Sequence, residues 1–331
     1  RYARLAAKHL GTEHQEKILS ARDSLNLIPN IANLLDEPLA DASILPTYLL
    51  SAFTKEQVTV ALGGDGGDEL FCGYDTFVAE RLAGIYAKIP AVIRDKIISR
   101  VISHLPVSWR NISFDFKLKK FIAGFAEQNI LRRNQGWLGS FSREQRQRLF
   151  APDVWRELEN TNEYEELDAY AANMAGQPDW NKLIYVYLRT YLMDDILVKV
   201  DRASMFKALE VRAPFLDYRL VDFVNGLPLD FKIRGLTTKF ILKELTKNKL
   251  PAEIINRKKK GFGIPLAQWL AKELKPLLAE LLNENYLQRQ GLFSGSFVSK
   301  LVKDHLERRA DNRKLLWTLL CFQLWQQKWL K

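Results

Sequence analysis

Val58–Leu62 (VTVAL) leads directly into Gly63–Glu69 (GGDGGDE), and this stretch decides the fold class. The first segment is short, apolar at nearly every position and rich in β-branched residues, which is typical of a parallel strand buried on both faces. The second segment is a glycine-rich turn, and an apolar stretch with helical spacing follows it. A strand, a glycine-rich turn and a helix in this order predict an α/β nucleotide site at the carboxyl edge of a parallel sheet.

The glycine-rich turn also carries three acidic side chains, Asp65, Asp68 and Glu69. Glycines let backbone N–H groups approach a phosphate closely, whereas carboxylates repel a phosphate. The two are compatible when a hard divalent cation lies between them, since Mg²⁺ binds one or two carboxylates together with phosphate oxygens. The turn therefore predicts a site for a polyphosphate that is bridged by Mg²⁺.

Two other interpretations of the turn stay open. Residues 63–70 also satisfy the repeat unit of a calcium-binding β-roll, but that architecture needs stacked copies and the chain has one. The other interpretation is a plain glycine-rich turn with solvated acidic side chains. A Walker-type phosphate loop does not fit, because no Gly-Lys-Ser/Thr follows the glycines.

Most of the remaining chain has helical hydrophobic spacing. This spacing predicts helices over residues 2–10, 23–35 and 315–322, the last of them buried. Gly11 would end the first of these helices, because glycine readily takes the left-handed conformation of a C-cap. We expect an α/β nucleotide-site part over residues 1–85 and a mostly helical part over residues 86–331.

Composition bounds the class of protein. The 331 residues are 47% hydrophobic and 27% charged, as in a globular protein, and 49 Lys and Arg against 39 Asp and Glu give a net charge of +10. That excess is compatible with nucleic acid, a phosphorylated small substrate or an acidic partner surface. Charges interrupt every apolar stretch before it reaches the length of a membrane span, and the two cysteines indicate a reducing compartment. We therefore expect a cytoplasmic protein with no membrane partner.

Five segments resemble the synthetase domain of glutamine-dependent asparagine synthetases, in the order that this family has them. They are residues 36–38 (DEP), 58–74, 198–205 (VKVDRASM), 210–217 (EVRAPFLD) and 257–265 (RKKKGFGIP). Two positions depart from the family pattern, since Gly63 stands where Ser is usual and Cys72 where Gly is usual. Some members carry Glu where Asp65 stands. We expect Cys72 to be a small buried side chain rather than an activated thiol.

The resemblance implies an α/β fold, namely a parallel-sheet ATP-pyrophosphatase (adenine nucleotide alpha hydrolase-like) domain with a large helical extension. It also implies a ligase that adenylates the side-chain carboxylate of aspartate with ATP and Mg²⁺, releases pyrophosphate and lets ammonia displace AMP. By the same resemblance, Gly64 and Asp65 would lie on ATP and Asp68 would hold Mg²⁺ on the pyrophosphate. Asp65 is also a candidate for polarising the ammonia, because this nucleophile must lose a proton.

The lysines carry further implications. Lys239 matches the family lysine that stabilises the pentacoordinate phosphorus of adenylation, so the resemblance implies a catalytic role. From spacing alone, Lys239, Lys243 and Lys247 would share one helix face, and a solvated surface is the alternative, favoured for the latter two. Arg257 and Lys259 belong to a run of four cations that we expect to face phosphate from a loop over the site. A nucleic-acid patch is the other option, but the run lacks interleaved aromatic residues.

The family's Ser-Gly-Gly-x-Asp-Ser signature for ATP and its N-terminal glutaminase domain are not found in the sequence. We therefore expect a synthetase domain that lacks its first strand or strands, is inactive alone, and uses aspartate together with ammonia made from glutamine by the missing domain. A homodimer is one option for the oligomeric state, and nucleic acid is not an expected partner. A relative that amidates another carboxylate, on a surface saccharide or as in a β-lactam synthetase, stays open. A tRNA-modifying ATP pyrophosphatase is the alternative from another class.

Overall fold

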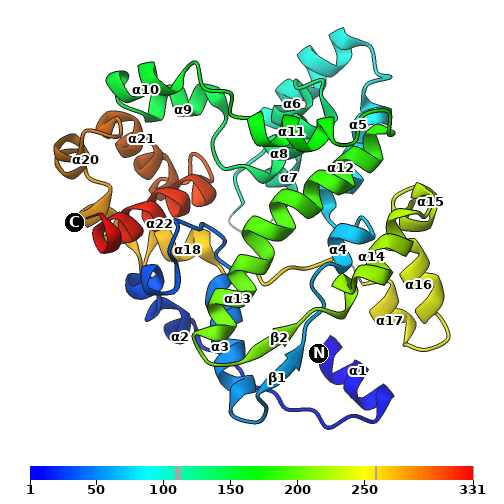
Figure 1. Ribbon diagram of the computed structural model, residues 1–331. Coiled ribbons are helices and arrows are strands. Elements are labelled where there is room, and N and C mark those ends of the chain that lie inside the picture. Colours follow the sequence, from blue (N-terminus) through cyan, green and yellow to red (C-terminus); the bar gives the residue numbers. More distant parts are fainter. Residues whose placement is uncertain (109–112, 258, 331) are drawn as a thin grey trace. The chain divides into compact units, whose positions relative to one another are not determined.

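The computed structural model describes residues 1–108, 113–257 and 259–330, which are mostly helical (Figure 1). The chain forms two compact units, each assembled from three separate segments. The first unit comprises Arg1–Ser24, Ile44–Gly84 and Tyr170–Phe262, and the second comprises Leu25–Ser43, Ile85–Ala169 and Gly263–Lys331. The protein is thus a mostly helical α/β chain with a small parallel sheet. The division at residue 85 concerned secondary-structure content and stays a prediction.

The elements follow the chain as listed here. Those lying mainly in the first unit are α1 (Tyr2–Leu10), α2 (Ala21–Leu25), α3 (Ile44–Lys55), β1 (Val60–Leu62), α4 (Gly67–Leu70), α5 (Asp75–Tyr86), α12 (Asp179–Tyr187), η3 (Leu188–Leu197), α13 (Val198–Met205), β2 (Glu210–Arg212), η4 (Pro214–Leu216), α14 (Tyr218–Asn225), α15 (Leu229–Lys232), β3 (Ile233–Arg234), β4 (Thr237–Thr238), α16 (Phe240–Thr246) and α17 (Ala252–Ile255). Those lying mainly in the second unit are η1 (Ile28–Leu34), η2 (Val92–Ile98), α6 (Ser99–Ser103), α7 (Phe114–Phe125), α8 (Ile130–Leu138), α9 (Arg143–Leu149), α10 (Pro152–Leu158), α11 (Glu165–Ala172), α18 (Leu266–Ala271), α19 (Lys275–Leu281), α20 (Glu284–Gln290), α21 (Gly295–Leu306) and α22 (Arg313–Trp329).

The parallel strand predicted before the glycine-rich turn is present. Strand β1 pairs in parallel with β2, so that Val60 lies opposite Glu210 and Leu62 lies opposite Arg212 (Figure 1). The pairing joins two distant stretches of chain, and the N–H of Gly63 extends it by donating to the carbonyl of Arg212 at 2.7 Å. The glycine-rich turn therefore begins where the parallel sheet ends, as the sequence predicts.

The prediction that this strand is buried on both faces is wrong. The side chain of Leu62 is 74% exposed and that of Val60 is 39% exposed. The parallel sheet of the described residues has two strands, so β1 lacks the flanking strands and covering layers of an inner strand in a larger sheet. The apolar run predicts the strand correctly but not its surroundings.

Two helix predictions have different outcomes. Helix α1 ends at Gly11, whose φ of 65° is left-handed, as predicted for a glycine C-cap. The single helix predicted over residues 23–35 is wrong, because α2 ends at Leu25 and a separate 3-10 helix, η1, begins at Ile28. Pro29 lies in the first turn of η1, where its missing N–H and fixed φ start a helix but would interrupt one already formed.

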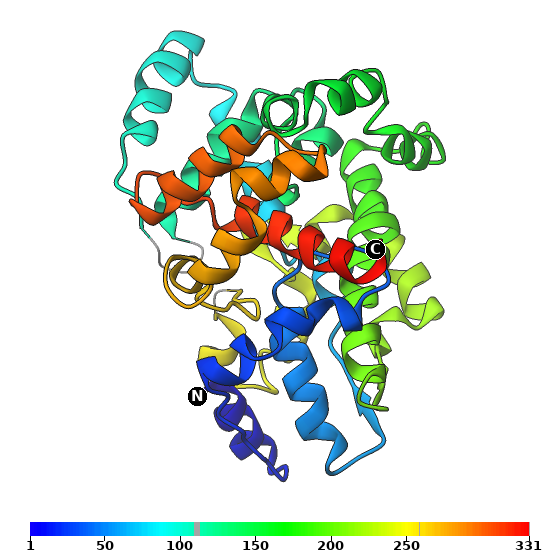
Figure 2. The same ribbon diagram turned by 90° about the vertical axis from the view of Figure 1, so that its left-hand side faces the viewer.

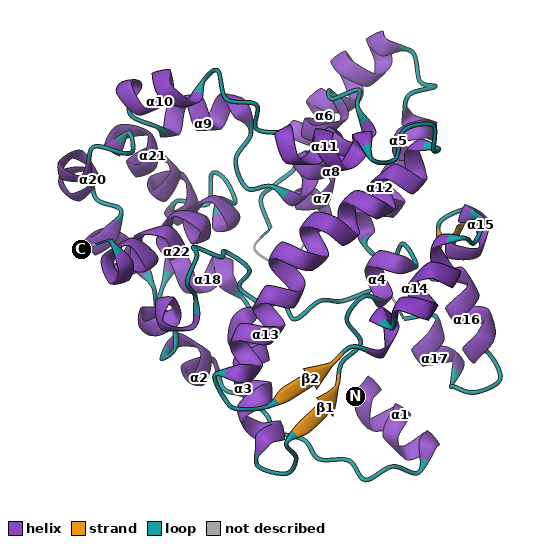
Figure 3. Cartoon of the chain, in the orientation of Figure 1, coloured by secondary structure: helices purple, strands orange, loops and turns teal. Residues whose placement is uncertain are grey.

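The first unit is organised around one long helical run. Helices α12 and α13 are joined by the π-helix η3 without a break, as the ribbon of Figure 3 shows. Helix α3 packs along α13. Leu70 and Phe71, at the end of the short helix α4, are buried with Val224 of α14 in one apolar cluster. This cluster anchors the segment that follows the glycine-rich turn.

The second unit is organised around its C-terminal helix, α22, drawn in red in Figure 2. Leu316, Trp317 and Leu320 of this helix are buried, which confirms the predicted buried helix over residues 315–322. The indole N–H of Trp325 donates to the carbonyl of Asp36 at 2.9 Å, which ties α22 to the end of η1. Among the described residues, no helix combines the length and the apolar character needed to cross a membrane.

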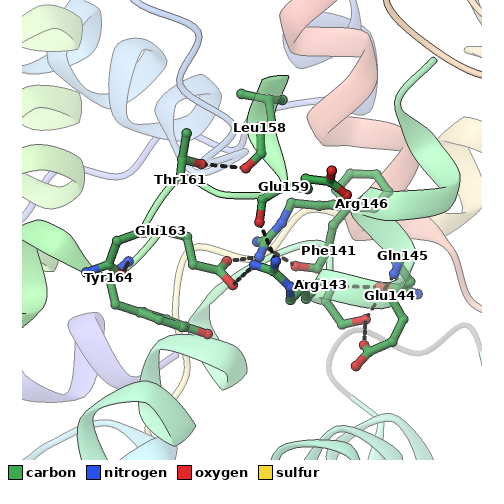
Figure 4. A network of polar contacts seen from close by, with 12 residues as sticks. Phe141, Arg143, Glu144, Gln145, Arg146, Leu158, Glu159, Thr161, Glu163 and Tyr164 are labelled. Atoms are coloured by element: carbon green, nitrogen blue, oxygen red, sulfur yellow. Dashed lines mark hydrogen bonds and ion pairs between the residues drawn. The ribbon is translucent and has the colours of Figure 1, made fainter. Parts of the chain in front are cut away.

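A polar network in the same unit ties helix α9 to the loop after α10 (Figure 4). Arg143 donates to the carbonyl of Glu159 at 2.6 Å, and Glu163 forms ion pairs with Arg143 and Arg146. Ser142 starts α9 with a capping box, which satisfies backbone N–H groups that the helix leaves without partners. These contacts fix the local course of the chain.

Candidate functional site

The glycine-rich turn is shaped by close contacts in the first unit. Gly66 has a φ of 87° and precedes α4, and a Cβ at this position would overlap the side chain of Leu216. A Cβ at Gly63 would lie 2.7 Å from Oδ2 of Asp65, so the Asp65 carboxylate folds back over this glycine. Gly64 is exposed and would meet nothing within 4 Å, which leaves its backbone accessible. Glycine is therefore required at the two positions that touch their surroundings.

Asp68 lies between two lysines that are distant in the sequence. Its Oδ1 lies 2.9 Å from Nζ of Lys239, and its Oδ2 lies 2.5 Å from Nζ of Lys259. The Asp68 side chain is only 16% exposed, and the two lysines are 30% and 35% exposed. Burial alone would raise the pKa of Asp68, but the charges of Lys239 and Lys259 outweigh burial and hold this pKa below its ordinary value. The cluster thus carries one ionised carboxylate and two cations.

Lys239 is held at its place by an unusual backbone. Its φ of 53° and ψ of 38° are left-handed, and it lies between the β3–β4 hairpin and the start of α16. Its N–H donates to the carbonyl of Phe71 at 3.0 Å, so the anchored segment after the turn also fixes this lysine. A left-handed conformation costs a residue with a Cβ about 1–2 kcal/mol, and such strain gathers at functional sites.

This backbone separates Lys239 from the helix predicted to carry it. Helix α16 spans only Phe240–Thr246, so Lys239 and Lys247 flank it and only Lys243 lies inside. Burial and then the charge of Lys239 lower the pKa of Lys243. The stripe of three lysines on one helix face is therefore wrong, because the left-handed residue ends the regular spiral.

Replacing Lys239 by Gly is expected to give a more stable protein than replacing it by Ala. Both variants lose the ammonium group, but only Gly takes this left-handed conformation without the steric penalty of a Cβ. We expect Lys239→Gly to exceed Lys239→Ala by about 1 kcal/mol in free energy of unfolding, measured by urea denaturation. Equal stability of the two variants would contradict the strained conformation.

Lys259 comes from a stretch without regular secondary structure, and aromatic rings contact it there. Its Nζ lies 5.2 Å from the centre of the Tyr74 ring, a distance at which cation–π attraction acts. Arg257 lies in the same way over the ring of Tyr2, at 5.0 Å. Lys258 of the predicted run lies outside the described residues. The structure thus brings Lys259 to Asp68, whereas Arg257 contacts helix α1.

Asp65 lies apart from the lysine pair. Asp65 is half-buried over Gly63, and among the described residues it forms no ion pair with Lys239 or Lys259. Of the residues predicted from the sequence, the structure brings Asp68, Lys239 and Lys259 into direct contact. Asp65 and Gly64 belong to the neighbouring turn.

Sequence reasoning missed Glu69 and Tyr74 as partners in the site. The Tyr74 hydroxyl donates to Oε1 of Glu69 at 2.5 Å, and Glu69 is only 1% exposed. Burial raises the pKa of the Glu69 carboxyl, while the hydrogen bond from Tyr74 opposes that rise. A carboxylate next to a metal-binding candidate, five residues before a tyrosine, was the available signal.

Cys72 has the environment that the sequence predicts for it. The side chain is buried, and burial raises the pKa of the thiol to about 12. Its φ of 53° lies in the left-handed region, which favours the glycine usual at this position. A thiol with this pKa is not an activated nucleophile.

The cluster has one feature that suits a cation such as Mg²⁺. Oδ1 of Asp68 is buried and accepts no hydrogen bond of good geometry among the described residues, although the ammonium of Lys239 lies at ion-pair distance. The described residues contain no group of three or more His, Cys, Asp or Glu side chains that could hold a metal by themselves. Since Mg²⁺ usually takes one or two carboxylates plus phosphate oxygens, Asp68 fits a site completed by a polyphosphate.

A glycine-rich turn at the end of a parallel strand, with an acidic and basic cluster beside it, defines a protein of the α/β nucleotide-site class. Comparison with known proteins makes the assignment specific, because residues 1–327 match the asparagine synthase family and the chain belongs to this family.

Its relatives include proteins named asparagine synthetase. It is 29% identical over 328 residues to asparagine synthetase [glutamine-hydrolyzing] 1 of Bacillus subtilis, covering 98% of this chain and 49% of that protein. It is 30% identical over 328 residues to a putative asparagine synthetase [glutamine-hydrolyzing] of Mycobacterium bovis, covering 97% and 47%. Amidase chry2 of Gibberella zeae is 25% identical over 275 residues, covering 77% and 39%. The chain spans about half the length of these relatives or less.

Proposed function

We propose that the chain is the synthetase part of a glutamine-dependent asparagine synthetase. In this proposal a carboxylate of aspartate attacks the α-phosphorus of ATP, pyrophosphate leaves, and ammonia derived from glutamine then displaces AMP. The observation that carries the proposal is the Asp68, Lys239 and Lys259 cluster beside a glycine-rich turn, in a chain of the asparagine synthase family. The complete reaction is proposed for a protein of the length of the relatives, of which this chain spans about half.

Each residue of the cluster has a chemical task in this proposal. Lys239 and Lys259 would place fixed positive charges where negative charge develops on the α-phosphate and on the departing pyrophosphate. Asp68 would hold Mg²⁺, which neutralises phosphate charge when bound. Because both lysines already contact Asp68, a polyphosphate bound by them would lie within reach of this carboxylate.

The turn and the basic segment would supply the remaining contacts. Gly64, with its accessible backbone, and Asp65 would line the ATP site, and Asp65 would take a proton from the attacking ammonia. Arg257 would add positive charge near the phosphates from the segment that carries Lys259. The parallel pairing of β1 with β2 supports an ATP-pyrophosphatase type of fold, in which ligands bind at the carboxyl edge of a parallel sheet.

The acceptor has one alternative with an observation behind it. One of the relatives is named an amidase, so a carboxylate other than that of aspartate is the second candidate substrate. The phosphate chemistry would be the same in both cases, since only the acceptor pocket differs. We propose a cytoplasmic location for either enzyme, because aspartate, glutamine and ATP are available there.

A screen of acceptors separates these candidates. The protein at the length of its relatives is incubated with ATP, Mg²⁺ and ammonium, with each candidate carboxylate in turn, and released pyrophosphate is measured. We expect release with aspartate and formation of asparagine. Release with another carboxylate and none with aspartate would contradict the proposed substrate while leaving the adenylation chemistry in place.

A further inference from the structure

The contacts of Tyr74 point to a task that the family assignment does not give it. Its ring lies 5.2 Å from Nζ of Lys259, and its hydroxyl donates to the buried Glu69. Its ring also contacts two further aromatic rings from the long helical run, those of Tyr187 at 6.1 Å and Tyr191 at 5.4 Å. Tyr74 is thus fixed at its hydroxyl end and along its ring edges, with Lys259 over the ring.

Lys259 depends on contacts of this kind, because its own segment has no regular hydrogen-bond ladder. The residues around it, from Arg257 to Pro265, lie between α17 and α18 and include exposed side chains such as Phe262 at 61%. A lysine in such a segment loses much side-chain and backbone freedom when it is held at one place. Its ion pair with Asp68 and the Tyr74 ring are the contacts that the structure gives its ammonium group.

We propose that Tyr74 is a positioning residue, whose ring seats Lys259 against Asp68 and so keeps the basic segment docked. Glu69 fixes the direction of the ring through the Tyr74 hydroxyl. This inference extends the proposed function, because the position of Lys259 would set how pyrophosphate is bound. Docking of the segment is itself independent of any ligand, and it can be measured without one.

Peptide-resolved trypsin cleavage of the chain without ligand tests the docking. We expect Tyr74→Leu to raise the cleavage rate after Arg257 and Lys260 by roughly two- to thirtyfold, the range that a cation–π contact spans. Tyr74→Phe keeps the ring and should stay closer to the original protein than to Tyr74→Leu. Tyr48→Leu is the matched control, because the Tyr48 ring lies 4.5 Å from Nζ of Lys207 in the same unit. It should speed cleavage after Lys207 and leave the basic segment unchanged.

A double-variant comparison shows whether Tyr74 acts through Lys259. Lys259→Gln should raise cleavage by itself, and adding Tyr74→Leu to it should raise cleavage little further, since the two residues share one contact. Circular dichroism checks that each variant is folded, and Tyr74→Met replaces Tyr74→Leu if the latter does not fold. Cleavage of Tyr74→Leu at the original rate, or effects of the two substitutions that simply multiply, would overturn the proposal.

Binding of Mg²⁺-pyrophosphate, measured by calorimetry, separates this inference from the proposed function. If the protein binds the probe, Tyr74→Leu should weaken binding by roughly two- to thirtyfold. If the original protein does not bind the probe, the proposed phosphate site is wrong, while the cleavage experiment still decides the docking. Unchanged binding by a Tyr74→Leu variant with faster cleavage would mean that docking does not serve phosphate, and would overturn the extension.

Discussion

Asp68→Asn is expected to lower aspartate-dependent exchange of pyrophosphate into ATP by about 10²–10³-fold, the loss typical of removing one electrostatic contact to a transition state. The change keeps the size of the side chain but removes the charge that Lys239 and Lys259 share and that Mg²⁺ would require. The measurement uses the protein at the length of its relatives, with saturating ATP. The variant should unfold cooperatively, which separates a chemical defect from a folding defect.

Asp304→Asn provides a matched control. Asp304 is also 16% exposed and also lies between two cations, Lys300 at 2.7 Å and Arg309 at 2.9 Å, but it belongs to the second unit. Its replacement removes a similar charge cluster and should leave the exchange within about twofold of the original, since such surface pairs contribute little. Equal losses in the two variants would argue that Asp68 acts through stability alone.

Gly73→Ala is expected to disrupt the cluster from its other side. A Cβ at this position would overlap Oδ1 of Asp68 and Cε of Lys239, and it would lie 2.9 Å from Cα of Asp68, which is backbone. The side chains could swing aside, but the backbone of Asp68 must also shift. We expect a loss of about 1–3 kcal/mol in free energy of unfolding, the usual cost of overpacking. Pyrophosphate exchange should fall further than stability alone explains, because the Asp68–Lys239 contact is displaced.

Gly84→Ala is the control for this substitution. Gly84 lies inside helix α5, and a Cβ there would meet nothing within 4 Å. Alanine is a better helix former than glycine, so this variant should gain up to about 1 kcal/mol and keep its exchange activity. Wild-type exchange by Gly73→Ala would contradict the role of Gly73 in making room for the cluster.

The sequence predicts the local features of the site because they depend on neighbouring residues. A β-branched run followed by glycines and acids predicts a strand ending in a turn, and β1 and the turn at Gly63 agree. The C-cap at Gly11 was predicted for the same reason. The implied importance of Asp68 and Lys239 came from resemblance, and their contact is compatible with it.

The features that were missed depend on residues far apart in the chain. The exposure of Leu62 depends on how many strands the sheet has, which the apolar run of β1 does not encode. The left-handed backbone of Lys239 depends on its contact with Phe71, and helical spacing alone placed this lysine inside a helix. The pairing of Tyr74 with Lys259 joins positions 185 residues apart (259 − 74), which no local pattern reports.

Transfer of oxygen-18 from labelled aspartate tests the central claim most directly. The protein at the length of its relatives is supplied with ATP, Mg²⁺, glutamine and aspartate labelled in its side-chain carboxylate, and the products are analysed by mass spectrometry. Attack of the carboxylate on the α-phosphorus leaves one labelled oxygen in AMP when ammonia displaces it. The account predicts labelled AMP and unlabelled pyrophosphate, and labelled inorganic phosphate with ADP would contradict it.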